Sequence, residues 1–389
     1  MSHVVKVETF ILTIPRTTPY LGPLGPGERV NSRGYLVRKG NGTIYPTVDR
    51  SVVVRVTTAD GAVGWGETYG ICAPRAVCEI INDLLAPELI GREPEDVEQI
   101  WDDLYGLMRV RGCFGGFHVD TIAALDIALW DLRARARGVP LWSLLGERQR
   151  EAIPGYLSGL PAGTVEAKVE MARAFAAEGH DAFKIHAVVS HEGIVEEIAA
   201  LREALGPKPE LMVDLHWKFD LGQALAMARQ LEPYRLKFIE APLKPEDIEG
   251  LIQLGKDSPV PIAAGEEWHT EYEARLRLAG GSLSYIQPEM GHTGITQFLR
   301  IARLAQAQGV PIAPHATIGG GLFMAASLHV AAVLPGLWRH EWQHSIFSRS
   351  LLMLDTDMAY RDGHYLLPSG PGLGAVPGAR FQDHAEAVA

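Results

Sequence analysis

Hydrophobic and polar positions change their spacing about a fifth of the way along the chain, from alternation to a helical period. Strand-like alternation marks VVKVETFILTI and SVVVRVTT, on either side of a Gly/Pro-rich stretch at residues 20–45. Helical periodicity then follows at residues 74–91, 93–108 and 119–138. Residues 1–125 are therefore predicted to form an α+β capping domain, and residues 20–45 a mobile lid, because structureless loops of that length are often lids.

From residue 155 onward, short apolar strands alternate with amphipathic helical segments. The expected strands are GYLSGL, DAFKIHA, ELMVDLH, LKFIEAPL, PIAAGEE, SYIQPEM, VPIAPHA and WRHEWQH. This rhythm predicts a (β/α)7-8 TIM-type barrel over residues 126–360, and residues 361–389 are expected to pack back on the capping domain. A doubly wound sheet is the alternative, but it would more naturally carry a Gly-rich phosphate loop after its first strand. The glycines at 319–321 lack the G-x-x-x-x-G-K pattern and are better explained by a tight turn.

Polar residues end six successive strands at a nearly constant interval. They lie at positions 214, 240, 266, 289, 315 and 341, so every step is 26 residues except one of 23. The carboxyl ends of barrel strands meet at one mouth, which should bring Asp214, Glu240 and Glu266 together. Three ionised carboxylates need a cation there, and oxygen ligands without a thiolate favour Mg²⁺, with Mn²⁺ as a substitute.

Composition narrows the classes of partner. The net charge of −11 comes from dispersed acidic residues without a block of Lys or Arg, which argues against a nucleic-acid or anionic-membrane partner. Three cysteines without zinc-like spacing fit a reducing compartment. The N-terminus is not typical of a signal peptide, and no apolar run reaches ~18 residues, so we expect a cytoplasmic protein.

With these motifs in place, the chain resembles the mandelate racemase subgroup of the enolase superfamily over nearly its whole length. AALDIALWDLRARARGVPLWSLLG is similar to the helix that opens the family's barrel domain, and Asp214, Glu240 and Glu266 match its metal ligands. The resemblance implies removal of a proton beside a substrate carboxylate. The cation and the strand-end residues would stabilise the enediolate that results.

The resemblance also assigns expected roles to the other strand-end residues. FKIHA carries Lys184 and His186 where the subgroup commonly has K-x-K; Lys184 is expected to bind the substrate carboxylate or transfer a proton, and His186 to be a base or a hydrogen-bond donor. His315 is the expected base on the other face, paired with Glu289 where the family has Asp. Glu341 matches the eighth-strand acid that donates a hydrogen bond to the substrate carboxylate. His216 lies in a D-x-H, as in galactonate dehydratases, which implies a general acid for the departing 3-hydroxyl.

The favoured function is therefore dehydration of a sugar acid to a 2-keto-3-deoxy acid. A racemase or epimerase using the same bases is the main alternative, and a barrel that only binds a metal and an acid is a second. A muconate-type cycloisomerase fits less well, because it normally has Lys where this chain has Glu289. Family members commonly form homo-oligomers. The residues expected to contact distal substrate hydroxyls are Tyr20, Arg29, Tyr35, Arg38 and Trp217.

Overall fold

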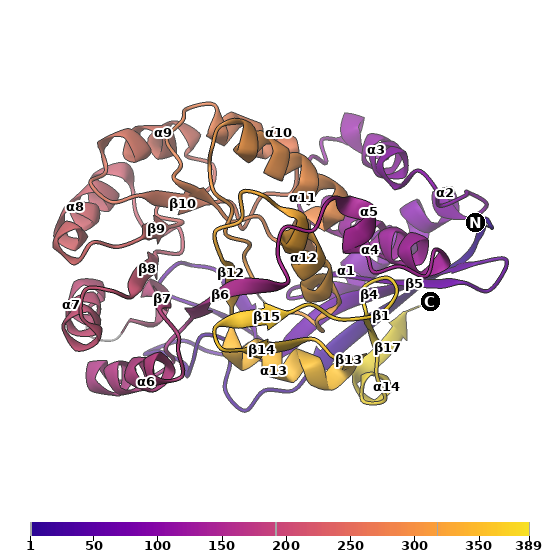
Figure 1. Ribbon diagram of the computed structural model, residues 1–389. Coiled ribbons are helices and arrows are strands. Elements are labelled where there is room, and N and C mark those ends of the chain that lie inside the picture. Colours follow the sequence, from indigo (N-terminus) through magenta and orange to yellow (C-terminus); the bar gives the residue numbers. More distant parts are fainter. Residues whose placement is uncertain (1, 191–192, 317, 389) are drawn as a thin grey trace.

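Two large sheets organise the chain in the computed structural model, which describes residues 2–190, 193–316 and 318–388 (Figure 1). The first is antiparallel, with the order β17-β1-β4-β5. Its strands are β1 (Val4–Ile14), β4 (Asp49–Thr58), β5 (Val63–Tyr69) and β17 (Ala385–Val388). The pairing of β17 with β1 brings the C-terminal segment onto the first strand of the chain.

Four helices accompany this sheet, and the longest lies directly against β5. They are α1 (Pro74–Ile80), α2 (Ala86–Leu89), α3 (Val97–Leu107) and α4 (Phe117–Ala136). Gly64 and Gly66 on β5 allow this packing, because a Cβ on either would collide with the backbone of α4. Almost every residue of α4 is buried, since it also packs against α11 (Met290–Ala307) of the second unit. Helix α4 is therefore shared by both units.

The second sheet is a barrel of parallel strands, to which a hairpin of β14 (Ala359–Arg361) and β15 (His364–Leu366) adds antiparallel at β6. Its regular strands are β6 (Ala152–Ser158), β7 (Ala182–His186), β8 (Glu210–Asp214), β9 (Phe238–Glu240), β10 (Ile262–Ala264), β11 (Tyr285–Ile286) and β12 (His340–Trp342). Isolated bridges at Ile312 continue the path from β11 to Leu337, and β12 pairs with β6 to close it. The prediction of a TIM-type barrel with an α+β capping unit is confirmed.

Helices cover the outside of the barrel strands (Figure 1). They are α6 (Val165–Ala177), α7 (Ile194–Leu205), α8 (Leu221–Leu231), α9 (Ile248–Asp257), α10 (Glu271–Leu278), α11 (Met290–Ala307) and α12 (Leu322–Val333). Several begin at a side-chain cap; for example, Asp220 forms a capping box with Gln223 at the start of α8. The remaining elements are α5 (Trp142–Leu145), α13 (His344–Ser350), α14 (Phe381–His384), β13 (Leu354–Thr356), β14 (Ala359–Arg361), β15 (His364–Leu366) and β16 (Ala375–Pro377).

The Gly/Pro-rich segment contains a short antiparallel hairpin of β2 (Tyr35–Val37) and β3 (Ile44–Pro46). The tip of this hairpin lies against the turn after β7, where a Cβ added to Gly40 would be 3.2 Å from Val188 Cγ2. The segment expected to be a lid thus contacts the barrel in this conformation.

A buried carboxylate joins the capping sheet to the glycines at 319–321. Glu67 on β5 accepts hydrogen bonds from the backbone N–H groups of Gly320, Leu322 (2.8 Å) and Phe323 (3.2 Å), and from Ser51 Oγ (2.5 Å). The N-terminus of α12 attracts negative charge, and here a protein carboxylate supplies it. This turn therefore binds a carboxylate of the chain itself.

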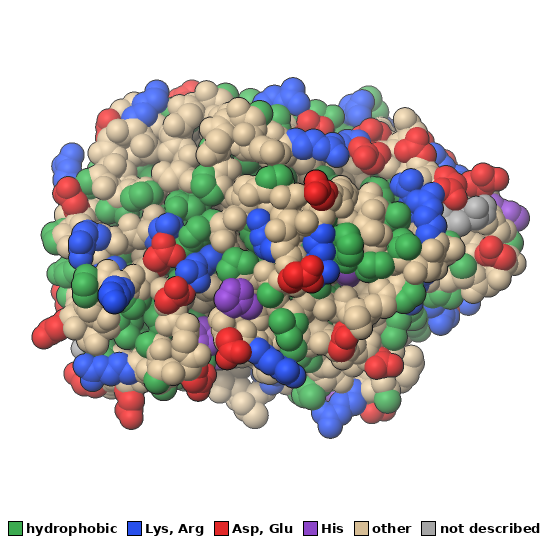
Figure 2. Space-filling model, viewed as in Figure 1, with side chains coloured by type: hydrophobic (Ala, Val, Ile, Leu, Met, Phe, Trp, Pro, Cys, Tyr) green, Lys and Arg blue, Asp and Glu red, His purple; other side chains and the backbone are tan. Residues whose placement is uncertain are grey.

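Among the residues described, no helix is both long and apolar enough to cross a bilayer. On the face shown in Figure 2, acidic and basic side chains are interspersed rather than gathered into separate areas.

Candidate active site

The register of the barrel strands places the polar residues at the ends of β7, β8 and β9 side by side. His186 pairs with Asp214 across β7 and β8, and Asp214 pairs with Glu240 across β8 and β9. One row of neighbouring strand ends therefore holds an imidazole and two carboxylates. Lys184 lies two residues before His186, so both point to the same side of β7, in agreement with the period of two along a strand.

Lys184 is completely buried between two acids. Its Nζ lies 2.7 Å from Glu240 Oε2 and 2.9 Å from Glu341 Oε1, and it also lies 5.4 Å from the centre of the Tyr156 ring. Burial alone would lower the pKa of Lys184, but Glu240 and Glu341 raise it well above its usual value. Lys184 is therefore a cation in this arrangement.

His315 lies among three carboxylates. Its Nδ1 is 2.8 Å from Glu289 Oε2, while its Nε2 is 3.2 Å from Glu266 Oε2 and 3.7 Å from Glu341 Oε2. Burial opposes protonation, yet Glu266 first and Glu341 and Glu289 after it raise the pKa of His315 well above its usual value. The extra methylene of Glu289 does not prevent contact with His315, and the backbone N–H of Gly291 holds its other oxygen at 2.9 Å.

His186 and His216 form a pair with the opposite electrostatic character. Their ring centres are 5.3 Å apart, and in each ring Nδ1 is buried without a hydrogen-bond partner among the described residues. His186 Nε2 contacts Ser158 Oγ at 2.9 Å, and His216 Nε2 lies 3.0 Å from Asp214 Oδ2. Burial lowers the pKa of His186 well below its usual range and that of His216 to about 4. Both rings are therefore neutral here.

The three expected metal ligands form two adjacent groups rather than a single one. Ligand atoms of Glu240, Glu266 and His315 lie within 4.8 Å of one another, and Asp214 forms such a group with His186 and His216. Asp214 Oδ1 also accepts the backbone N–H of His216 at 2.8 Å. Within the described residues, the Asp214 carboxylate is thus directed toward its own D-x-H motif.

The donor set at the mouth nevertheless fits a divalent cation. Glu240 Oε1 and Glu266 Oε2 are buried without an aligned hydrogen-bond donor among the described residues. Burial and the nearby acids raise the pKa of Glu266 well above its usual value, and burial raises that of Asp214 to about 6. Lys184 and a protonated His315 cannot together balance the carboxylates of Asp214, Glu240, Glu266, Glu289 and Glu341, so a bound cation would relieve the desolvation cost of ionising them.

The residues expected to bind distal hydroxyls have different surroundings. Arg38 is buried, and its guanidinium donates to the carbonyl oxygens of Tyr20, Gly22 and Pro23 and to Glu28. These bonds hold the Gly/Pro-rich segment together. Arg29 is exposed, and Trp217 is half-buried beside His216.

Two tyrosines of this set pack within the protein. The Tyr35 hydroxyl accepts from Arg50 Nη1 and from the backbone N–H of Ala73, each at 3.0 Å. Tyr20 is buried in a small cluster with Ile318 and Ile346. The pattern of the loop alone could not show these contacts, because they depend on how the hairpin folds.

Tyr45, which the residue pattern did not single out, lies near the carboxylates of the mouth. Burial raises the pKa of Tyr45 to about 12, and the charges of Glu266 and Asp214 add to this shift. Its hydroxyl accepts a hydrogen bond from Asn41 Nδ2 at 3.2 Å. Strand β3 of the hairpin therefore directs a phenol toward the mouth, and only the pairing of β2 with β3 reveals it.

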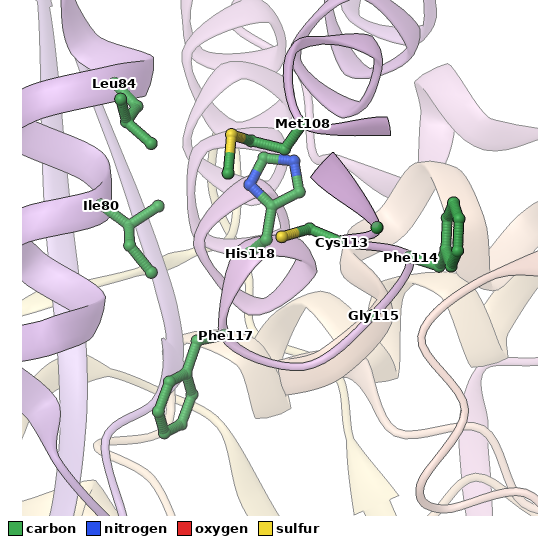
Figure 3. A pocket seen from close by; sticks show the side chains of 9 residues that line it. Ile80, Leu84, Met108, Cys113, Phe114, Gly115, Phe117 and His118 are labelled. Atoms are coloured by element: carbon green, nitrogen blue, oxygen red, sulfur yellow. The ribbon is translucent and has the colours of Figure 1, made fainter. Parts of the chain in front are cut away.

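A separate cavity of about 480 Å³ lies between α1, α4 and the loop that precedes α4 (Figure 3). Its lining is mainly apolar, with His118 among Ile80, Leu84, Met108, Cys113, Phe114 and Phe117. The expected catalytic and metal-binding residues are not among those lining it, so the mouth is the better candidate for the chemistry.

Comparison with known families gives a match in both units of the chain. Residues 166–380 match the model described as enolase C-terminal domain-like, and residues 44–146 match the N-terminal domain of mandelate racemase and muconate lactonizing enzyme. The chain belongs to the enolase superfamily. It is an enzyme of the mandelate racemase subgroup, with a matching region that extends over both units.

Three similar proteins illustrate the range of this superfamily. A D-galactonate dehydratase from Pectobacterium atrosepticum is 33% identical over 351 residues, which cover 85% of this chain and 90% of that protein. A D-galactarolactone cycloisomerase from Agrobacterium fabrum is 31% identical over 338 residues, covering 83% and 88% respectively. The crystal structure of an enolase superfamily member from Agrobacterium tumefaciens has 49% identity, a TM-score of 0.97 and full coverage of both chains.

Proposed function

We propose that this enzyme dehydrates a sugar acid, an aldonate or aldarate of the galactonate type, to a 2-keto-3-deoxy acid. The observation that carries the proposal is the unequal pair of imidazole settings around the carboxylates: His315 with Glu289 on one side, and His216 with His186 on the other. β-Elimination needs a base for the C2 proton and an acid for the 3-hydroxyl. The dehydratase similarity supports the same reaction.

Asp214, Glu240 and Glu266 would hold the cation, which we propose to be Mg²⁺ with Mn²⁺ as a substitute. When bound, such a cation supplies Lewis-acid stabilisation of the negative charge that develops on the substrate carboxylate. Glu240 can serve both Lys184 and a cation, because Lys184 contacts Oε2 while Oε1 has no partner among the described residues.

The residues of the chain would share the proton transfers as follows. Lys184 binds the substrate carboxylate as a cation, Glu341 donates a hydrogen bond to it when protonated, and His315 Nε2 accepts the C2 proton. Glu289 accepts the hydrogen bond from His315 Nδ1–H, which fixes the tautomer in which Nε2 exchanges the proton. Glu266 is the carboxylate that raises the pKa of His315 most, so a cation held by Glu266 would lower that pKa and free Nε2 to act as the base. The C2–H bonding electrons first pass into the substrate carboxylate to give the enediolate. They then form the C2–C3 double bond of the enol as the C3–O bond breaks, and the enol tautomerises to the keto acid.

His216 would give a proton to the departing 3-hydroxyl, so that water leaves. With a pKa of about 4, His216 is neutral before substrate arrives, and its unpartnered Nδ1 can accept a proton. An anionic substrate beside the ring favours the imidazolium, because opposite charge raises the pKa of a histidine. His186 then lies next to His216 as a hydrogen-bonding partner for the substrate.

The lid segment would cover the bound sugar acid. We propose that Tyr20, Arg29, Tyr35, Arg38 and Trp217 shape the distal part of this pocket, Arg38 and Tyr35 by holding the segment in place. We also propose that the chain is divided into a capping domain (1–125), a barrel domain (126–360) and a C-terminal segment (361–389). A cytoplasmic homo-oligomer is the expected form, and light scattering of the purified protein tests the oligomeric part.

The direct experiment incubates the enzyme and Mg²⁺ with a library of aldonates and aldarates, followed by an assay for 2-keto acids. At least one galactonate-like acid should yield a 2-keto-3-deoxy product, and chelation of the cation should stop its formation. If no acid in the library gave a 2-keto product although the enzyme still bound the metal, the dehydratase proposal would be contradicted.

An isomerase, such as a racemase or epimerase of a 2-hydroxy acid, is the second candidate. It is favoured by the neutral His186 and His216, because a second base is what proton return from the opposite face requires. Running the reaction in D₂O separates the two: an isomerase incorporates deuterium at C2 with no loss of the 3-hydroxyl, whereas a dehydratase forms a keto acid.

A further inference from the structure

A second group of metal-binding side chains lies outside the mouth, where the capping unit meets the barrel. Asp120 is in the first turn of α4, His269 follows β10, and His292 is in the first turn of α11. His292 Nδ1 lies 2.7 Å and His269 Nε2 lies 3.3 Å from the same oxygen, Asp120 Oδ1. Ligand atoms of all three residues lie within 4.8 Å of one another.

These separations match the spacing of ligands around a small transition-metal ion. Zinc lies about 2.0–2.2 Å from nitrogen and oxygen ligands, so neighbouring ligand atoms are roughly 3.0–3.5 Å apart. The 3.3 Å separation lies within that range, and the 2.7 Å separation is shorter, so the His292 and Asp120 atoms would have to move apart slightly. Small side-chain rotations would be enough to admit the ion between them.

Hydrogen bonding alone leaves this group incompletely satisfied. One carboxylate oxygen faces two imidazole nitrogens, and His269 Nε2 is buried without an aligned partner among the described residues. The two imidazole rings are 4.6 Å apart between centres, inclined at 51°. A cation seated between the three atoms would satisfy the nitrogen that the carboxylate does not, since buried polar atoms are normally paired.

Neighbouring groups hold both histidines in position. Glu273 accepts the backbone N–H of His269 at 2.8 Å, and its carboxylate lies 3.9 Å from His269 Nδ1. The ring of His292 packs on Tyr69, with 4.1 Å between ring centres. A carboxylate behind a ligating imidazole is the common arrangement at metal sites.

An ion can reach this group from solvent. The His292 side chain is 22% exposed. On the other side, Gly115 lies against His269, where an added Cβ would be 3.4 Å from Nδ1, and Gly115 also borders the cavity in Figure 3. The group is therefore held in place but open, as a site that keeps coordination positions for water would be.

We propose that Asp120, His269 and His292 form a second metal site, selective for a borderline-soft divalent ion such as Zn²⁺ over Mg²⁺. Two imidazoles and one carboxylate suit Zn²⁺ and Co²⁺, whereas Mg²⁺ prefers oxygen ligands. His269 lies three residues after Glu266, and His292 three after Glu289. A bound ion would tie α4 to the two segments that position these acids. This site does not depend on which reaction the mouth catalyses.

Binding of Co²⁺ to the full-length enzyme tests the site directly. The chelator-stripped protein is dialysed against Co²⁺ with excess Mg²⁺, which competes for the oxygen-rich mouth. Bound Co²⁺ is counted by elemental analysis and followed by its visible absorption. Wild type should retain one Co²⁺ per chain that Mg²⁺ does not displace, and Zn²⁺ should displace it.

Matched variants separate this site from the mouth. His269→Asn and His292→Asn are made separately and checked for folding by thermal melting. Each variant should lose the Co²⁺ ion that Mg²⁺ does not displace, together with its visible absorption. Glu240→Gln at the mouth and His364→Asn at an exposed histidine should keep them. Glu273→Gln should weaken Co²⁺ binding about 10–100-fold. The proposal would be overturned if wild type bound no Co²⁺ in the presence of excess Mg²⁺. It would also be overturned if both histidine variants folded and still bound that Co²⁺.

Discussion

His315 and the pair of His186 and His216 occupy two sides of the same mouth, but their electrostatic settings are opposite. Carboxylates surround His315 and raise its pKa, whereas burial beside Lys184 and a second imidazole lowers the pKa of the pair. The same residue type is thus poised for two different proton affinities by its neighbours. In this arrangement His315 favours the imidazolium and His216 the neutral ring, the reverse of what their proposed roles need, so a bound cation and an anionic substrate would have to exchange the two proton affinities.

Replacing His315 should have the largest effect. His315→Asn removes the proposed base, so kcat should fall about 10²–10⁴-fold, the usual contribution of general acid–base catalysis. Exchange of the C2 proton with D₂O, measured by proton NMR, should disappear together with product formation. His364→Asn, at an exposed position, is the control. Exchange at the wild-type rate in the His315 variant would assign the base elsewhere.

Replacing His216 should slow dehydration but leave exchange of the C2 proton. His216→Asn removes the proposed acid but leaves His315 and Glu289, so keto acid formation should fall about 10²-fold. Exchange of the C2 proton should continue, because abstraction and return of the proton need only the base. Loss of exchange in equal measure would show that the two sides do not have separate roles, and unchanged isomerisation would favour the isomerase.

His329 tests whether burial alone produces a low pKa like that of His216. This histidine of α12 accepts from the Trp142 N–H and donates to the Leu373 carbonyl, and burial lowers its pKa to about 4. The folded state holds it neutral, so stability should decrease as pH falls from 6.5 to 4, then level off. The loss from this residue is on the order of 3 kcal/mol.

Chemical denaturation at several pH values checks this prediction. His329→Gln should show a smaller loss of unfolding free energy between pH 7 and 4 than wild type, while His364→Gln should behave like wild type. An identical pH dependence in the His329 variant would mean that its ring is already charged in the folded protein.

The smallest effect should come from the hairpin. Tyr45→Phe removes one hydroxyl near Glu266 and Asp214, so we expect kcat/KM to fall about 2–10-fold, the usual range for a single hydrogen bond. Steady-state kinetics with Tyr272→Phe, an exposed tyrosine of α10, provide the comparison. Equal values for both variants would mean that Tyr45 has no part in covering the substrate.

The strand-end spacing was enough to predict the barrel and to select the residues that meet at its mouth. Each of Asp214, Glu240 and His315 follows an apolar strand, and such strands can bury their length only by pairing with neighbours, which brings their ends together. Glu289 could be assigned to His315 in the same way, although its longer side chain left the contact open until the 2.8 Å distance was known.

Other features depend on which hydrogen-bond partner a side chain finds in the folded protein, and a residue pattern does not contain that information. Arg38 was expected to contact the substrate, but its guanidinium donates hydrogen bonds to the carbonyl groups of its own loop. Asp214 is directed toward His216 because the chain after β8 turns back on itself, with φ of 49° at His216 and 54° at Trp217. A left-handed backbone at two successive non-glycine residues is energetically costly, and neither His nor Trp at these positions would lead one to predict it.

The bond between Glu67 and the turn before α12 has a consequence for protein engineering. Exchanging capping units between relatives is an attractive way to alter specificity, since the segment proposed as a lid lies in the proposed capping domain. In this enzyme such a chimera would separate a carboxylate from the amide groups that compensate its burial. A successful exchange must therefore transplant Glu67 and residues 319–323 together.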